Sequence, residues 1–393
     1  MKEVVVLSAS RTAIGDYLGT LSNVSAVELG IAAARSALEK SGVKPEQVDE
    51  VVAGNVLQAG CKGNTGRQVC LGAGCPVETV ALTVNQMCPA SMRATEIASQ
   101  QIMLGKTDIE LVVGYESMSN APYMSLKARQ GLRMGDAPFV DHMLYDGLVD
   151  AFNNYHMGIT AENLAEQYKV SREEQDEWAY MSHQRAIAAI KGGKFKDEIT
   201  PFIVKTKKGE ISFEIDEHPR EDLTPESLSK LKPAFKKDGT VTAGNASSLN
   251  DGGAALVLTS SDKAKELGQK PMVKLVASAS AAVDPKIMGF GVVPAVQKAL
   301  KFAGLSMSDI GLWELNEAFA AQVIACNREL KIDKSIINVN GSGISLGHPV
   351  GQTGARIITT LLHEMKKRDV KYGVASLCAG GGPAVATVFE LIK

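Results

Sequence analysis

A cysteine followed directly by a proline is the first feature of this chain that could do chemistry. Cys88 and Pro89 stand in "TVNQMCPASMR", between a β-branched segment and a run of good helix formers. Proline is favoured at the first position of a helix, where the missing amide would have no partner, so a helix is predicted to begin at Pro89. Free cysteine is usually a small buried hydrophobe. At a helix N-terminus, however, the thiolate is favoured, and Cys88 becomes a candidate nucleophile with a lowered pKa.

Three further segments carry groups that could serve the same reaction. His348 precedes a proline and a helical run in "GHPVGQTGAR", and Asn316 lies in "ELNEAFA" as a neutral hydrogen-bonding group. Cys378 opens "CAGGG", whose free amides could bind an oxyanion. Considered singly, each has a plain structural interpretation: a core cysteine, a hydrogen-bonded structural histidine or a turn residue. Only their relative positions can decide between structure and catalysis.

An internal repeat relates these segments to one another. Three stretches recur in order, namely "VVVLSAS" at 4–10 as "VKLVASAS" at 273–280, "SALEKSGVKPEQVDEVVAGN" at 36–55 as "KALKFAGLSMSDIGLWELNE" at 298–317, and "TVNQM" at 83–87 as "NVNGS" at 338–342. The order of the matches indicates two copies of one unit. Each copy reads strand, helix, strand, strand, helix, strand. We therefore predict an α/β fold of two duplicated halves, each with a mostly parallel mixed sheet.

A long insertion interrupts the first copy. The closing strand "PAVATVFELI" follows "CAGGG" directly in the second copy, whereas its counterpart "GGAALVLTS" at 252–260 arrives only after residues 119–249. A segment this long is predicted to fold as a unit of its own. The predicted division is an N-terminal half of residues 1–118 with 250–269, an inserted loop domain of residues 119–249, and a C-terminal half of residues 270–393.

The repeat also predicts where the reactive groups meet. Two copies packed about a pseudo-twofold axis bring equivalent loops together at the ends of the strands, where open α/β sheets bind ligands. The loop of Cys88 is then equivalent to the loop of His348, and the loop of Cys378 to "GYESMS" in the first copy. Two thiols, an imidazole, a carboxamide and a Gly-rich turn are therefore predicted to share a catalytic cleft.

Composition excludes several other classes of protein. The 393 residues are 45% hydrophobic with a formal net charge of −2, which allows a large core but no overall basic field for nucleic acid or anionic membrane. The six cysteines form no CxxC pair, and no metal-ligand spacing or Gly-rich phosphate motif occurs, so we expect neither a metal nor a redox cofactor. No segment is long enough for a signal peptide or a membrane span, and a cytoplasmic location is expected.

The chain resembles the thiolase family over its whole length. The shared patterns are "VNQMC" around Cys88, "NEAFA" at 316–320, "GHPVGQTGAR" at 347–356 and "CAGGG" at 378–382, with "HMGITAEN" at 156–163 and "GNAS" at 244–247 in the insertion. The resemblance implies a five-layered fold and a homotetramer built as a dimer of dimers. "YHMG" and the short chain resemble the biosynthetic branch, which joins two acetyl-CoA molecules into acetoacetyl-CoA and CoA.

The resemblance also implies a role for each residue. Cys88 carries the acetyl group, His348 takes the proton of Cys88, and Cys378 removes the α-proton of the second acetyl-CoA. Asn316, through a water, and His348 hold the enolate oxygen. The backbone amides of Cys88 and Gly380 hold the tetrahedral oxyanion. Coenzyme A is a substrate and product rather than a cofactor, and the residues expected to bind it are Arg220, Ser247, His156, Met157, Phe235, Met288 and Phe319.

The departures from the family pattern keep alternatives open. Pro89, Ala90 and Ser91 replace the usual Gly-rich turn after the nucleophile, and their bulk is expected to narrow the acyl site. One alternative is a degradative 3-ketoacyl-CoA thiolase of broader range. A second is a decarboxylating ketoacyl synthase, which shares the fold but uses one cysteine and two histidines. A third is a non-catalytic, thiolase-like protein that binds acyl-CoA. The physiological direction stays open because the same groups serve both directions.

Overall fold

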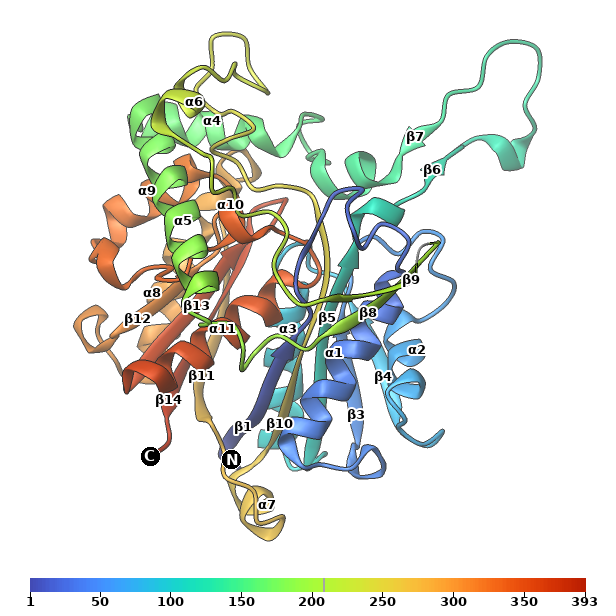
Figure 1. Cartoon of the computed structure of the whole chain (residues 1–393), viewed down its shortest axis with the longest axis vertical. Coiled ribbons are helices and arrows are strands. Elements are labelled where there is room, and N and C mark those ends of the chain that lie inside the picture. Colours follow the sequence, from blue (N-terminus) through green and yellow to red (C-terminus); the bar gives the residue numbers. More distant parts are fainter. Residues whose placement is uncertain (208) are drawn as a thin grey trace.

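The computed structural model describes residues 1–207 and 209–393. Within these residues the main sheet has ten strands, and its order is β12-β13-β14-β11-β1-β10-β5-β3-β4, with β2 paired to β10. The strands run through the centre of the molecule, and helices lie beside them on several sides (Figure 1). The order separates into two blocks, one from each half of the chain.

The N-terminal half supplies one block of the sheet and four helices. Its elements are β1 (Val4–Arg11), β2 (Gly15–Asp16), α1 (Ala26–Ser41), β3 (Glu50–Gly54), α2 (Thr65–Gly72), β4 (Val80–Val84), α3 (Ala90–Met103), β5 (Ile109–Ser117), β10 (Asn250–Ser260) and α7 (Ser261–Glu266). Strand β3 is parallel to β4 and β5, and β10 is antiparallel to β5 and β1. The block is therefore a mixed sheet in which β10 runs against its neighbours.

The C-terminal half repeats this plan. Its elements are β11 (Val273–Ala282), α8 (Val292–Ala303), β12 (Leu312–Leu315), α9 (Ala320–Leu330), α10 (Gly343–Leu346), α11 (Thr353–Arg368), β13 (Tyr372–Cys378) and β14 (Pro383–Leu391). Strands β12 and β13 are parallel, and β14 is antiparallel to β13 and β11. The two blocks meet through the short antiparallel pairing of β1 with β11, at Val5 with Lys274 and Val6 with Val273.

Buried side chains arrange the two halves in five layers. Apolar residues of α3 and α11, such as Ile102 and Leu361, share one cluster with strands of both halves, such as Val112 and Leu377. Helices α1 and α2 pack with the N-terminal strands in a second cluster, and α8 and α9 pack with the C-terminal strands in a third. The layer order is thus helix, sheet, helix, sheet, helix, and the five-layered prediction is confirmed.

One predicted strand does not form. The segment "NVNGS" at 338–342 was matched with 83–87, which includes the end of β4, but at and just before it there are only isolated bridges, Trp313 with Ile337 and Val339 with Gly341. Asn338 has a left-handed backbone (φ 47°), which interrupts an extended strand. Its side chain accepts from the Leu315 N–H (2.8 Å) and donates to the Leu315 carbonyl (2.7 Å), while its backbone N–H donates to the Trp313 carbonyl (2.8 Å). Most of the bonding of Asn338 to β12 is therefore made by the carboxamide.

The insertion leaves the sheet after β5 and returns at β10. It contains β6 (Tyr123–Met124), β7 (Val140–Asp141), the π-helix η4 (Met143–Leu148), α4 (Met157–Gln167), α5 (Arg172–Lys191), β8 (Phe202–Thr206), β9 (Gly209–Phe213) and α6 (Pro225–Ser229). Strands β6 and β7 lead into an arm that projects from the body of the molecule (Figure 1). Leu164 of α4 and Trp178 of α5 belong to the same buried cluster as α8 and α9. Helices α4 and α5 therefore pack onto the C-terminal half, whereas β8 and β9 pack with residues of the N-terminal half through Val204 and Phe213.

Short 3₁₀ turns complete the described chain. They lie at Pro45–Gln47, Met118–Asn120, Ala128–Gln130, Pro285–Gly291, Met307–Asp309 and Lys334–Ile336. The helix predicted to begin at Pro89 begins one residue later, at Ala90, and Pro89 is the residue that precedes it (φ −81°, ψ 13°). The proline still lies where the helix starts, so Cys88 stands two residues before the first helical position.

Candidate active site

A cavity of about 630 Å³ opens between the insertion and the two halves. Cys88, His348 and Gly380 line it, and so do all the residues expected to bind coenzyme A, namely Arg220, Ser247, His156, Met157, Phe235, Met288 and Phe319. The other two predicted catalytic residues lie behind this wall, because Cys378 is 1% exposed and Asn316 is fully buried. The cavity thus brings together ten of the predicted residues.

Cys88 stands at a sharp turn between β4 and α3. Met87 before it has a left-handed backbone (φ 57°), which is rare for a non-glycine residue. The Met87 N–H donates to Oδ1 of Asn85 (2.9 Å), and the Met87 carbonyl accepts from the Ala90 N–H (2.9 Å). The turn is therefore bonded on both sides of the cysteine, and the thiol faces the cavity at the start of α3.

The expected lowering of the Cys88 pKa is wrong. Burial raises the pKa of the Cys88 thiol to about 11, because removal from water disfavours the thiolate. The backbone amides of Cys88 and Gly380 lower the pKa, and the Glu116 carboxylate raises it, but burial has the largest effect. The helix N-terminus alone does not ionise this thiol, so Cys88 needs a base to become a nucleophile.

His348 is held by hydrogen bonds from three sides. Its backbone N–H donates to Oδ1 of Asn250 (2.9 Å), and its Nδ1 lies 2.6 Å from Oγ1 of Thr353. The Thr353 hydroxyl donates to the Pro349 carbonyl (2.8 Å), so it accepts from Nδ1–H of the imidazole. The pattern assigns the proton to Nδ1. Nε2, which lies 3.4 Å from Nδ2 of Asn316, then carries the lone pair that a base needs.

Burial keeps the imidazole neutral. The pKa of His348 is lowered to about 3, first because burial disfavours the charged ring and second because the Arg356 cation lies nearby. The thiol of Cys88 is neutral for the same physical reason. The resting site therefore holds a thiol and an uncharged base rather than a thiolate and an imidazolium.

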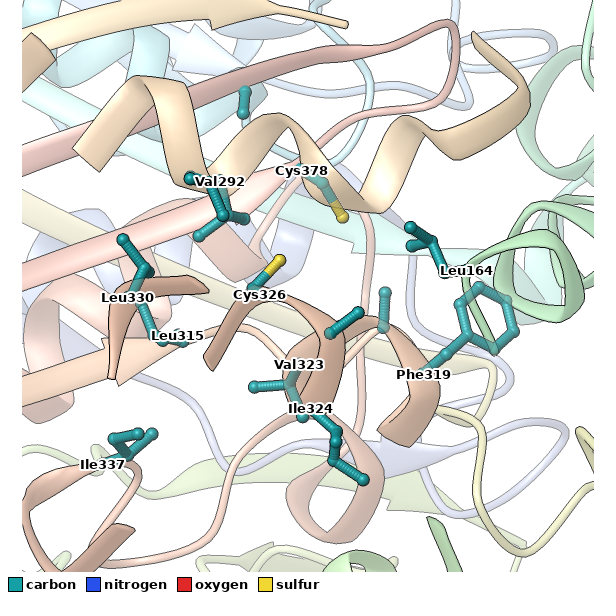
Figure 2. Packing of buried hydrophobic residues seen from close by; sticks show 14 of the residues in the cluster. Leu164, Val292, Leu315, Phe319, Val323, Ile324, Cys326, Leu330, Ile337 and Cys378 are labelled. Carbon is teal, nitrogen blue, oxygen red and sulfur yellow. The ribbon is translucent and has the colours of Figure 1, made fainter. Parts of the chain in front are cut away.

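Cys378 ends β13 inside the apolar core of the C-terminal half. Figure 2 shows it among the labelled side chains of this cluster, with Cys326 of α9 close by. The pKa of Cys378 is well above its usual range because of burial and, less strongly, because of the neighbouring thiols of Cys88 and Cys326. A thiolate with a raised pKa is a strong base, which is the property that removal of an α-proton requires.

Gly380 allows the chain to pass close to Cys88. A side-chain carbon at this position would lie 2.7 Å from Cε of Met157 and 3.4 Å from Cε of Met87. A larger residue there would have to move the end of the Met157 side chain, whereas the approach to Met87 is an ordinary contact. The amide of Gly380 lowers the pKa of Cys88 together with the cysteine's own amide, so the two N–H groups lie beside the sulfur, where the carbonyl oxygen of an attacked thioester would become an oxyanion.

The expected coenzyme A contacts form an aromatic wall. The His156 ring stacks on Phe235 (centroids 4.5 Å apart), and Phe319 meets Phe235 edge-on at 6.1 Å. A side chain at Gly158 would lie 2.2 Å from the Phe235 ring, which explains the glycine of "HMGIT". Nδ1 of His156 accepts from the Gly158 N–H (3.0 Å) and so caps α4. Burial lowers the pKa of His156, so this wall is uncharged.

Sequence reasoning missed two residues of the site and misplaced three others. Thr353 and Asn250 hold His348, and their only sequence signals are the spacing of threonine in "GHPVGQTGAR" and an asparagine that opens the strand after the insertion. Pro89, Ala90 and Ser91 were expected to narrow the acyl site. All three are buried and none lines the cavity, and α3 turns Ala90 and Ser91 toward the sheet and α11.

Two further properties concern the residues that the structure describes. Across 1–207 and 209–393, no helix combines the length and apolar character needed to cross a bilayer. Over the same ranges, no group of three or more His, Cys, Asp or Glu side chains is arranged to hold a metal ion.

Family models identify the two halves of the chain. Residues 4–262 match the thiolase N-terminal domain, and residues 269–391 match the thiolase C-terminal domain. Together with the layered fold and the Cys88 and His348 loops, these matches show that the chain belongs to the thiolase family.

Individual relatives are similar over their full length. An acetyl-CoA acetyltransferase of Pseudomonas aeruginosa is 53% identical over 98% of both chains, and one of Cupriavidus necator is 50% identical over 99% of this chain and all of the relative. Among solved structures, the acetyl-CoA acetyltransferase of Syntrophomonas wolfei matches with a TM-score of 0.98 at 49% identity, and each chain is covered completely. Human mitochondrial 3-ketoacyl-CoA thiolase in complex with CoA matches with a TM-score of 0.96 at 43% identity, over all of this chain and 98% of that one.

Proposed function

We propose that this thiolase is an acetyl-CoA C-acetyltransferase, which reversibly condenses two acetyl-CoA molecules into acetoacetyl-CoA and CoA. The observation that carries the proposal is the single cavity that holds Cys88, the neutral base His348 and the residues expected to bind coenzyme A. The relatives from Pseudomonas aeruginosa and Cupriavidus necator bear this activity in their names.

In the first half-reaction, Cys88 takes the acetyl group. Sγ of Cys88 attacks the thioester carbonyl while its proton passes to Nε2 of His348, so the thiolate exists only as the new bond forms. The amides of Cys88 and Gly380 hold the developing oxyanion. The bond between the carbonyl and the CoA sulfur then breaks, and His348 returns the proton to that sulfur. The products are acetyl-Cys88 and CoA.

In the second half-reaction, Cys378 acts as a base. The Cys378 thiol gives its proton to Nε2 of His348, which is neutral again after the first half-reaction, and the resulting thiolate removes a proton from the methyl group of the second acetyl-CoA. The enolate oxygen is held by the protonated His348 and, through a water, by Asn316. The enolate carbon attacks acetyl-Cys88, and the bond from the acetyl carbon to Sγ breaks. His348 then protonates the Cys88 thiolate while Cys378 keeps the proton from the methyl group, which restores the starting state and releases acetoacetyl-CoA.

Thiolysis of acetoacetyl-CoA by free CoA tests the proposal. The reaction is followed by the loss of enolate absorbance, and rapid loss that depends on CoA is the expected result. A decarboxylating ketoacyl synthase or a non-catalytic binding protein would not consume acetoacetyl-CoA in this way. Failure of the purified chain to do so would overturn the proposal.

Chain length separates this function from that of a degradative thiolase. The similarity to the human 3-ketoacyl-CoA thiolase keeps the broader activity as the second candidate. Acetoacetyl-CoA is expected to be cleaved far more efficiently than 3-ketoacyl-CoA substrates of eight or more carbons. Equal kcat/KM values for the two would favour the second candidate.

The proposal extends to the oligomeric state, the cofactors and the cellular location of the protein. A homotetramer is supported by apolar side chains exposed near and along the β6–β7 arm, which are Tyr123, Leu126, Leu132, Met134 and Phe139. It is also supported by β4, which is the last strand of the sheet order. Light scattering should give four times the chain mass.

We also propose that no metal or redox cofactor takes part in the reaction. Because all six cysteines are free thiols, we further propose that the enzyme works in the reducing cytoplasm.

A further inference from the structure

Ser91 lies at the contact between the helix that follows Cys88 and the helix that follows His348. It is fully buried in the second position of α3, and it packs into a space made by glycines. A side-chain carbon at Gly114 would lie 2.4 Å from Cβ of Ser91, and one at Gly354 would lie 2.9 Å from its Oγ. These glycines come from β5 and from the first turn of α11. Because they have no side chains, the backbones of both elements can lie close to Ser91.

The Ser91 hydroxyl makes two hydrogen bonds, both to the start of α11. It donates to the Gln352 carbonyl (3.2 Å) and accepts from the Ala355 N–H (2.9 Å). Ala355 is in the first turn of α11, where backbone N–H groups have no partner within the helix. Gln352, the residue at the cap position, provides no side-chain hydrogen bond of its own. Ser91 therefore caps α11 from the opposite half of the molecule.

The capped turn is the one that orients the imidazole. Thr353, the first residue of α11, contacts Nδ1 of His348 at 2.6 Å. On the other side, Ser91 lies three positions after Cys88 on the same turn of backbone. The Ser91 hydroxyl therefore connects the helix that follows Cys88 to the helix turn that holds His348.

We propose that Ser91 is a positioning residue that fixes the place of the His348 imidazole relative to the Cys88 thiol. The inference rests on the proposed function of these two groups. Burial keeps the Cys88 thiol and the His348 imidazole neutral, so the proton must pass from Sγ to Nε2 while Cys88 attacks the thioester. The rate of such a transfer depends steeply on the distance and angle between the two groups. The two hydrogen bonds from Ser91 to the start of α11, which we call the clamp, hold this geometry before substrate binds.

Ser91→Ala and Ser99→Ala form a matched pair for the test. Ser99 is on the same helix and is 2% exposed, but its hydroxyl donates to the Glu96 carbonyl (2.7 Å) within α3. In thiolysis of acetoacetyl-CoA, Ser91→Ala is expected to lower kcat about tenfold with the KM for CoA within about twofold, as for a small misplacement of reacting groups. Ser99→Ala should leave kcat within about twofold, although each variant loses one buried hydroxyl.

Alkylation of Cys88 gives a readout that needs no turnover. Iodoacetamide labelling at neutral pH, followed by mass spectrometry, should be several-fold slower in Ser91→Ala than in the parent and unchanged in Ser99→Ala, because proton acceptance by His348 assists the reaction. If the parent chain shows no thiolysis, the proposed function fails while the alkylation comparison still tests the clamp.

Clear outcomes overturn the inference. A folded Ser91→Ala protein with the parental kcat and alkylation rate would do so, as would equal losses in the two variants, which would show only a general effect on α3. Should Ser91→Ala not fold, Ser91→Gly removes the same hydroxyl with less bulk, and the same lowering of kcat at constant KM is expected. If neither variant folds, Ser91 is a folding determinant and the positioning role is wrong.

Discussion

The loop of Cys88 and the loop of His348 occupy equivalent places in the two halves, yet they hold their reactive groups differently. The imidazole of His348 is anchored through both ring nitrogens and a backbone amide, whereas the Cys88 thiol is set by a left-handed residue and faces backbone amides. One loop fixes a base in a single tautomer. The other leaves a sulfur free to move toward a carbonyl.

Burial shifts the pKa values of Cys88 and His348 in opposite directions. It raises the pKa of Cys88 to about 11 and lowers the pKa of His348 to about 3, so the donor holds its proton tightly and the acceptor binds one weakly. An ion pair at rest would require both shifts to be reversed. The thiolate nucleophile therefore arises during the attack and is not present in the resting site.

The largest effect is expected for removal of the thiol in the first loop. Cys88→Ala cannot form a covalent intermediate, so both acetyl transfer from labelled acetyl-CoA to the protein and all thiolysis should be abolished. Intact-protein mass spectrometry after incubation with acetyl-CoA measures the first, and enolate absorbance measures the second. Acetylation of the variant at another cysteine with retained turnover would contradict the assignment.

Removal of the second thiol should separate the two half-reactions. Cys378→Ala keeps Cys88 and His348, so the protein should still be acetylated, while condensation should fall by ~10²–10⁴-fold, as is typical for loss of a positioned base. The double variant should be no worse than Cys88→Ala in turnover, because residues that act together are not additive. A folded Cys378→Ala protein that binds CoA but resists acetylation would show that Cys378 serves the first step.

A smaller loss is expected when the anchor of the imidazole is removed. Thr353→Val keeps the shape of the side chain but leaves Nδ1 of His348 without its partner, so the ring is free to adopt the wrong tautomer. The acetylation rate of Cys88 should fall by about tenfold to a hundredfold, less than loss of a base itself. Thr353→Ser keeps the hydroxyl and is the control. Equal rates for the valine and serine variants would remove Thr353 from the mechanism.

The smallest effect concerns stability in acid. The pKa of His348 is depressed in the folded state, so the unfolded chain binds more protons between its usual value of about 6.5 and the folded value of about 3. Stability is therefore lost as pH falls through this window. Between pH 7 and pH 5, the parent should lose about 2 kcal/mol of unfolding free energy that His348→Asn does not lose. Urea unfolding of both proteins at both pH values measures the difference, and parallel losses would place the titration elsewhere.

The repeat made most of the fold predictable. Equivalent strands and helices follow from equivalent patterns, and the meeting of the Cys88 and His348 loops follows from the pseudo-symmetry of the copies. The failure at 338–342 has a local cause, because Asn338 has a left-handed backbone and its carboxamide makes bonds to β12 that a strand would make through its main chain. Hydrophobic periodicity does not reveal where a side chain will take the hydrogen bonds of the backbone.

The electrostatics of the site could not be predicted in the same way. A helix N-terminus next to Cys88 is visible in the sequence, but the extent of burial is a property of the packed structure, and here it outweighs the helix. Thr353 and Ser91 read as ordinary helix residues. The Thr353 hydroxyl acts within its own loop, on a histidine five residues before it. The Ser91 hydroxyl acts only because α3 and α11 meet, and that contact joins positions 261 residues apart.

The narrow seam between β1 and β11 has a consequence for how the enzyme reaches its native state. The two blocks of the sheet share only two paired positions there, so the halves are joined mainly by the buried cluster of α3 and α11. Apart from the pairing of β1 with β10, contacts within a half span shorter stretches of chain than the α3–α11 contact, and closure of the longer loop costs more entropy. We expect refolding to regain secondary structure first and to dock the halves afterwards, with β10 completing the first half only after the insertion has been traversed. Catalytic activity, which needs α3 and α11 side by side, is then the last property that the refolding chain acquires.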